Sequence, residues 1–146
     1  MRVDFYQLSR DPVERVVAML ARKVIASGAR LLVVSEDKAQ RDVLSKELWR
    51  APPQEFLANG EADAPGSDQQ PILLSSEAQA TNGASMIVMA DGKWRDDATS
   101  FERAFLLFGQ SDTEAARSTW RQLDGLDGAE REIHKQDQQG KWAAGG

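Results

Sequence analysis

Four short apolar runs, separated by polar sequence, constrain the fold of this chain more than any other feature. They lie at residues 31–34, 71–74, 85–89 and 104–108. A continuous apolar run of this length is typical of a strand that is covered on both faces, as the strands of parallel sheets are. An aromatic-rich segment at residues 3–8 predicts a further strand at the start of the chain.

Helical patterns alternate with these strands. Asp11 is predicted to be the N-cap of the first helix and Pro12 its first residue, because apolar side chains then recur at helical spacing as far as Val24. Residues 35–37 are predicted to cap a second helix that ends near Trp49. A strand, helix, strand and helix in succession imply a right-handed crossover between parallel strands. A last helix is predicted over residues 112–123.

The predicted fold class is α/β: a three-layer domain with a mostly parallel central sheet, resembling a mononucleotide-binding fold without a phosphate loop. We expect residues 1–146 to form a single domain, because this length is typical of one. Residues 58–70 predict a polar loop, and the polar segment 124–146 is expected to be partly disordered. The sequence contains no apolar stretch long enough to span a membrane, which predicts a soluble cytoplasmic protein.

The sequence offers little for catalysis. The turns at residues 9–12 and 35–37 contain no glycine and match no phosphate-binding motif, so no cofactor is expected. Cysteine is absent, and the single histidine, His134, stands among charged residues without an identifiable catalytic partner. The alternative function is a small nucleotide- or metal-dependent enzyme on a Rossmann-like fold that uses acidic pairs, although helix capping explains those pairs more simply. The pairs are Glu36 with Asp37, Asp96 with Asp97, and Asp124 with Asp127.

Two sets of aromatic and basic residues point instead to protein partners. Trp49 and Phe56 lie at the predicted end of the second helix and in its exit loop, where large apolar side chains either complete the core or anchor a partner. Arg117, Trp120 and Arg121 share one face of the last predicted helix. Two guanidinium groups beside an indole can bind an acidic peptide with an aromatic ring or a free carboxylate, although an amphipathic helix that buries its tryptophan has the same pattern. The net charge of −5 argues against direct binding to DNA.

Several short motifs resemble a known family in their order and spacing. They are Asp4-Phe5-Tyr6-Gln7-Leu8, Gly28-Ala29-Arg30, Leu48-Trp49, Glu55-Phe56-Leu57, Pro71-Ile72-Leu73-Leu74, Ala116-Arg117-x-x-Trp120-Arg121 and Gly140-Lys141-Trp142. Together they resemble the chi subunit of bacterial DNA polymerase III holoenzyme over residues 3–142. The chain departs from the family pattern at Ala58 and Asn59, where a proline and a histidine are usual.

The resemblance implies a non-catalytic accessory subunit in the bacterial cytoplasm, at the nucleoid-associated replisome. Chi subunits form a heterodimer with the psi subunit, which tethers them to the clamp loader. They also bind the acidic C-terminal tail of single-stranded DNA-binding protein, and so reach DNA only indirectly. By position, Arg117, Trp120 and Arg121 match the residues that receive this tail. Trp49 and Phe56 match the aromatic pair of the psi-binding surface, which can also serve a repair helicase.

Overall fold

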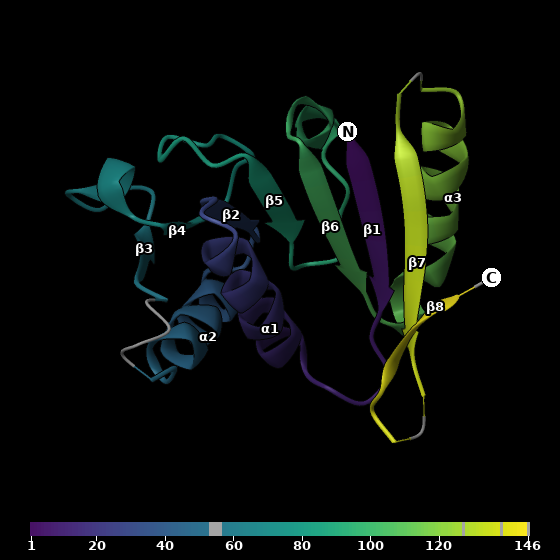
Figure 1. The fold of residues 1–146 in the computed structure, drawn as a ribbon, viewed down its shortest axis with the longest axis horizontal. Helices are drawn as coiled ribbons and strands as arrows, with labels where there is room; N and C mark the ends of the chain where they lie inside the picture. Colours follow the sequence, from purple (N-terminus) through teal and green to yellow (C-terminus); the bar gives the residue numbers. More distant parts are fainter. Residues whose placement is uncertain (53–56, 127, 138, 146) are drawn as a thin grey trace.

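The structure, a computed structural model, describes residues 1–52, 57–126, 128–137 and 139–145. Within these residues, the strands form one sheet in the order β3-β4-β2-β5-β6-β1-β7-β8 (Figure 1). Every neighbouring pair is parallel except β7 and β8. The elements are β1 (Arg2–Gln7), α1 (Val13–Ala26), β2 (Leu31–Val34), α2 (Lys38–Trp49), β3 (Asn59–Glu61), η2 (Ser67–Gln69), β4 (Ile72–Ser75), β5 (Met86–Met89), η3 (Asp96–Ser100), β6 (Arg103–Phe108), η4 (Gln110–Asp112), α3 (Thr113–Asp124), β7 (Glu130–Gln136) and β8 (Trp142–Gly145).

Helices cover both faces of the sheet, with α1 and α2 on one face and α3 on the other (Figure 1). Strand side chains alternate between two hydrophobic cores, so Leu31 and Val33 of β2 face α1 and α2, whereas Leu32 and Val34 face the opposite side. This arrangement explains why the run at residues 31–34 is apolar without alternation, and it confirms the predicted α/β fold class. None of the described helices combines the length and the apolar character that a bilayer crossing requires.

The neighbouring strands β1 and β6 lead to helices on opposite faces of the sheet. α1 follows β1 on one face, and α3 follows β6 on the other. In α/β folds, ligands bind at such switch points, outside the carboxyl ends of the two strands. Here those ends are Gln7 and Phe108.

The start of α1 differs from the prediction. Asp11 is not the N-cap, because the helix begins at Val13, after Pro12, and no side chain caps it. The carboxylate of Asp11 instead accepts a hydrogen bond from Nε2 of Gln136 at 2.8 Å, which binds it to β7. The N-terminus of α2 is as predicted: Asp37 accepts a hydrogen bond from the backbone N–H of Ala39 at 3.0 Å.

Three strands lie where the sequence predicts none. β3 is part of the predicted loop 58–70, and β7 and β8 lie in the segment 124–146, for which we expected partial disorder. β7 pairs with the whole of β1, in a register that places Arg2 beside Glu130 and Gln7 beside Lys135. Its backbone thus has a long partner although its side chains are mostly polar. These side chains are only partly buried, which is why β7 carries no apolar run.

Candidate functional site

A groove lies between α3 and β7 at the switch point of the sheet. Its volume is about 430 Å³. Phe5 of β1 and Phe108 of β6 form part of its floor, and both are almost completely buried. The lining residues are Phe5, Gln7, Phe108, Thr113, Ala116, Arg117, Trp120, Ile133 and Lys135.

The walls of the groove come from two segments. Arg117 and Trp120 belong to α3, where residues three positions apart are neighbours. Ile133 and Lys135 belong to β7, where alternate side chains share one face. Helical spacing predicted that Arg117, Trp120 and Arg121 share one face, and the structure brings Arg117 and Trp120 together at the groove. Lys135 was not predicted, although the alternation of Arg-Glu-Ile-His-Lys from residue 131 was a signal that could have found it.

Positive charge lies at the rim of the groove. The exposed guanidinium of Arg117 donates a hydrogen bond to the carboxylate of Glu114 at 2.9 Å. An exposed pair of this kind contributes little stability, so another carboxylate can replace Glu114 at low cost. Lys135 is exposed and has no carboxylate partner among the described residues. Arg121 is exposed one turn further along α3 and does not line the groove.

The indole of Trp120 is held at the edge of the groove by two neighbours. Its ring centroid lies 5.1 Å from that of Phe5, at an interplanar angle of 60°. The guanidinium carbon of Arg131 lies 4.6 Å from the centroid of the same indole. Trp120 is partly buried, so part of its side chain remains accessible to solvent. A groove with an apolar floor, an aromatic wall and cationic rims can accommodate a ligand that combines an aromatic ring with negative charge.

Trp49 lies apart from the groove, at the end of α2. Its side chain is 59% exposed, whereas Leu44 and Leu48 of the same helix are buried. Trp49 therefore does not complete the core, and its indole is an exposed apolar group at the end of α2. Phe56, the other residue of the predicted partner-binding pair, lies outside the described residues.

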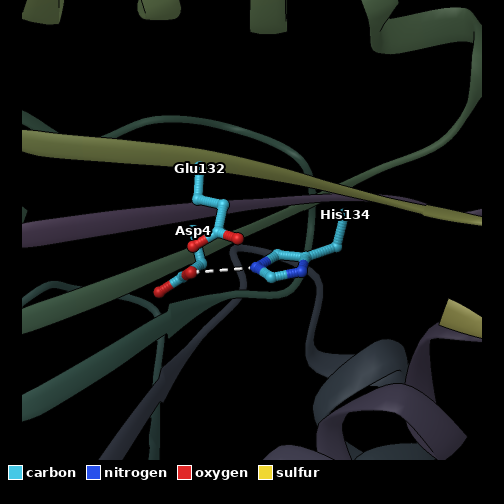
Figure 2. Close-up of side chains that lie close together, drawn as sticks. All are labelled: Asp4, Glu132 and His134. Atoms are coloured by element: carbon cyan, nitrogen blue, oxygen red, sulfur yellow. Dashed lines mark hydrogen bonds and ion pairs between the residues drawn. The ribbon is translucent and has the colours of Figure 1, made fainter. Parts of the chain in front are cut away.

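A second cluster of charges lies on the opposite face of the sheet from the groove. The carboxylate of Asp4, on β1, is completely buried and accepts hydrogen bonds from Nε of Arg103 at 2.7 Å and from Nη2 of Arg2 at 3.0 Å. Nε2 of His134, on β7, lies 2.9 Å from the same carboxylate (Figure 2). Arg2 also binds Glu132, so we call these five residues the Asp4 network.

The Asp4 network has the spacing of a metal site but not its electrostatics. Ligand atoms of Asp4, Glu132 and His134 lie within 4.8 Å of one another. However, Arg2 binds both carboxylates, and Arg103 binds Asp4 as well. These guanidinium groups occupy the carboxylate oxygens and repel a further cation. The network is therefore an ion-pair cluster that joins β1, β6 and β7.

The pKa of Asp4 reflects this environment. Burial by itself raises the pKa of the carboxyl group, because it disfavours the charged form. Hydrogen bonds from Arg103, His134 and Arg2 act in the opposite direction and outweigh burial. The pKa of Asp4 is therefore lower than the ordinary value of an aspartate, and the ionised network stabilises the folded state.

The loop between β1 and α1 is closed by Gln136. The Oε1 atom of Gln136 accepts hydrogen bonds from the backbone N–H groups of Arg10 at 3.0 Å and Asp11 at 3.1 Å. In nucleotide-binding folds, the backbone N–H groups after the first strand bind phosphate. Here a side chain of the protein takes two of them, which gives a physical basis for the predicted lack of a phosphate loop.

The acidic pairs that the enzyme alternative requires have structural partners. Besides Asp37, which caps α2, Glu36, Asp96 and Asp124 bind basic or amide side chains, whereas Asp97 accepts a hydrogen bond from Ser100 through its backbone oxygen. Asp127 lies outside the described residues. The contacts are Glu36 with Lys93 at 2.7 Å, Asp96 with Gln122 at 3.1 Å and Asp124 with Arg131 at 2.7 Å.

Comparison with known proteins relates this fold and groove to a family. Residues 1–129 match the family described as DNA polymerase III chi subunit, HolC. The chain belongs to the chi subunit family. A curated protein of this family, the probable DNA polymerase III subunit chi of Rickettsia prowazekii (strain Madrid E), is 27% identical over 84 residues. The similarity covers 58% of this chain and 51% of that protein, so the chain matches about half the length of the curated relative.

Membership of the chi family confirms the resemblance stated from the sequence. The family is that of an accessory subunit of the replicative DNA polymerase. The match ends at residue 129, immediately before β7 begins at Glu130. Of the two walls of the groove, the matched range therefore contains α3 but not β7.

Proposed function

We propose that this chain links the clamp loader of DNA polymerase III to single-stranded DNA-binding protein. It attaches to the clamp loader through the psi subunit, and it binds the acidic C-terminal tail of the DNA-binding protein in the groove between α3 and β7. It acts by protein contacts and not by catalysis. Membership of the chi family supports a place in the replicative polymerase. The observation that carries the tail-binding role is a groove whose apolar floor lies beside an indole and two cations.

The groove offers apolar surface for the aromatic end of such a tail and positive charge for its carboxylates. A terminal aromatic ring would lie over Phe5 and against Trp120, where apolar atoms favour its burial. The terminal carboxylate and neighbouring aspartates would meet Arg117 and Lys135, from opposite walls. Arg121, one turn further along α3, would meet acidic residues that precede the aromatic end. This role for Arg121 rests on its match to the family, because it does not line the groove.

A peptide titration tests this proposal. A labelled peptide ending in Asp-Asp-Asp-Ile-Pro-Phe is expected to bind saturably, as followed by fluorescence anisotropy. Arg117→Ala and Lys135→Ala should each weaken binding by about fivefold to tenfold, since each removes a charge-assisted contact. Arg121→Ala should have a smaller effect. Binding should weaken as salt rises, because exposed charges are screened within about 10 Å at 0.1 M ionic strength.

A peptide of the same charge without its terminal phenylalanine is the matched control. It should bind more weakly than the full peptide to the wild type, because it leaves the apolar floor empty. Equal affinity for both peptides would show that charge alone is recognised. If the folded wild-type protein did not bind the full peptide at low salt, the tail-binding role would be excluded.

The exposed end of α2 is the proposed psi-binding surface. Trp49→Ala should weaken binding to the psi subunit by at least tenfold, because interface hot spots, in which tryptophan is enriched, cost about 2 kcal/mol or more when they are truncated. Co-purification and calorimetry with psi would measure this effect. The same variant should leave tail-peptide affinity unchanged, since Trp49 does not line the groove. Unchanged psi binding would place the psi interface elsewhere.

A further inference from the structure

Arg131 makes three contacts with α3 from the neighbouring strand β7. Its Nη1 atom donates a hydrogen bond to the backbone oxygen of Trp120 at 2.6 Å. Its Nη2 atom donates to the carboxylate of Asp124 at 2.7 Å. Its guanidinium carbon lies 4.6 Å from the centroid of the Trp120 indole. One side chain thus binds the backbone, the ring and the end of the helix that forms a wall of the groove.

The charge of Arg131 is engaged by these contacts. Asp124 neutralises it, and its side chain is only 20% exposed. Arg131 does not line the groove, whereas Lys135, on the same face of β7, does. The two basic residues of this strand therefore stand in different positions: Lys135 lines the groove, and Arg131 contacts Trp120, which forms its aromatic wall.

We propose that Arg131 is a positioning residue for ligand binding, which fixes the indole of Trp120 as the wall of the groove. The proposal rests on the proposed tail-binding function. A tryptophan on a helix surface otherwise samples several rotamers, and ordering it on binding costs affinity. A guanidinium over the indole removes this cost before the peptide arrives. Phe5 holds the indole from a second direction.

The contacts of Arg131 require a guanidinium group and not only a positive charge. Arginine can place separate N–H groups on the Trp120 carbonyl and on Asp124 while its plane packs against the ring. A lysine ammonium is a compact charge without this planar fork. Arg131→Lys therefore keeps the charge of β7 but loses the positioning contacts.

The test compares Arg131→Lys with Lys135→Gln. The protein is labelled with fluorotryptophan, and the Trp120 resonance in fluorine NMR is assigned from its loss in Trp120→Phe. In Arg131→Lys, this resonance should shift or broaden in the free protein. Peptide affinity should fall by about threefold to fivefold, the value of a partly exposed cation–π contact, with an unchanged salt dependence. In Lys135→Gln, the resonance should stay in place and the salt dependence should decrease.

Two results would overturn the proposal. An unchanged Trp120 resonance and wild-type peptide affinity in Arg131→Lys would show that the contact does not order the ring. In Arg131→Gln, which removes the charge, a decrease in salt dependence like that of Lys135→Gln would make Arg131 a direct ligand contact. Asp124→Ala, at a side chain that is 72% exposed, is a second variant that should fold normally and shift the resonance in the same direction. If even the wild type bound no peptide, the tail-binding function would fail, while the resonance of the free protein would still report on the indole.

Discussion

Replacing Asp4 with alanine should lower the free energy of unfolding by about 3 kcal/mol, because the substitution leaves the cations around a buried carboxylate without their partner. Arg2 and Arg103 are each more than a third exposed, so water can compensate them in part. This places the expected loss at the lower end of what broken buried ion pairs cost. Urea denaturation followed by circular dichroism would measure it. Glu132→Gln is the matched control and should cost less than about 1 kcal/mol, since Glu132 is 39% exposed.

The pH dependence of the same difference identifies its cause. The pKa of Asp4 is lower in the folded protein than in the unfolded chain, because the hydrogen bonds from Arg103, His134 and Arg2 outweigh burial. The stabilisation by its charge is therefore complete above the unfolded pKa of about 4 and is lost as the pH falls through the folded value. The difference in the free energy of unfolding between the wild type and Asp4→Ala should accordingly become smaller below pH 4. A difference that stayed constant down to pH 2 would mean that the charge of Asp4 does not stabilise the fold.

Trp120→Ala should weaken binding of the acidic, phenylalanine-ended peptide by about 30-fold or more, the loss expected when a tryptophan at the centre of an interface is removed. The indole forms the aromatic wall of the groove, and no other aromatic residue of α3 can take its place. Anisotropy titration at fixed salt measures the loss. The melting temperature of the variant should be measured beside the titration, because Trp120 also packs on Phe5 and its removal changes stability as well.

Two variants define what the Trp120 result means. Trp120→Tyr keeps an aromatic ring and should retain most of the affinity, whereas Trp49→Ala removes a tryptophan from another surface and should retain all of it. If Trp120→Ala remained folded and bound the peptide like the wild type, the groove would not be the binding site. If Trp49→Ala lost the peptide instead, the site would lie at the end of α2.

The apolar strands could be predicted from the sequence because a strand that is buried on both faces is a continuous apolar run. Residues 31–34 form β2 with the predicted boundaries, and Asp37, one of the residues 35–37 that were predicted to cap α2, makes the capping hydrogen bond. Asp11 failed as a cap because a long-range partner, Gln136, competes for its side chain. Capping rules consider only local sequence, so they cannot include such a competitor.

Only those site residues that lie on one helix could be predicted from the sequence. Helical spacing placed Arg117 and Trp120 together, because neighbours on a helix are separated by a fixed number of residues. Lys135 and Arg131 reach the same place through the pairing of β7 with β1, across more than a hundred residues of sequence. No local pattern encodes that distance. Asp4 was missed as well, since one aspartate in an aromatic strand does not show which cations will surround it.

The polar composition of β7 has a consequence for the protein in concentrated solution. Without β7 and β8, the apolar strand β1 would end the sheet and expose unpaired N–H and C=O groups to other chains. β7 covers that strand, and its charged residues 130–132, with which β8 does not pair, lie at the sheet margin, where charged side chains oppose edge-to-edge association of copies. The polar side chains that prevent the prediction of β7 as a strand thus also oppose aggregation of the protein.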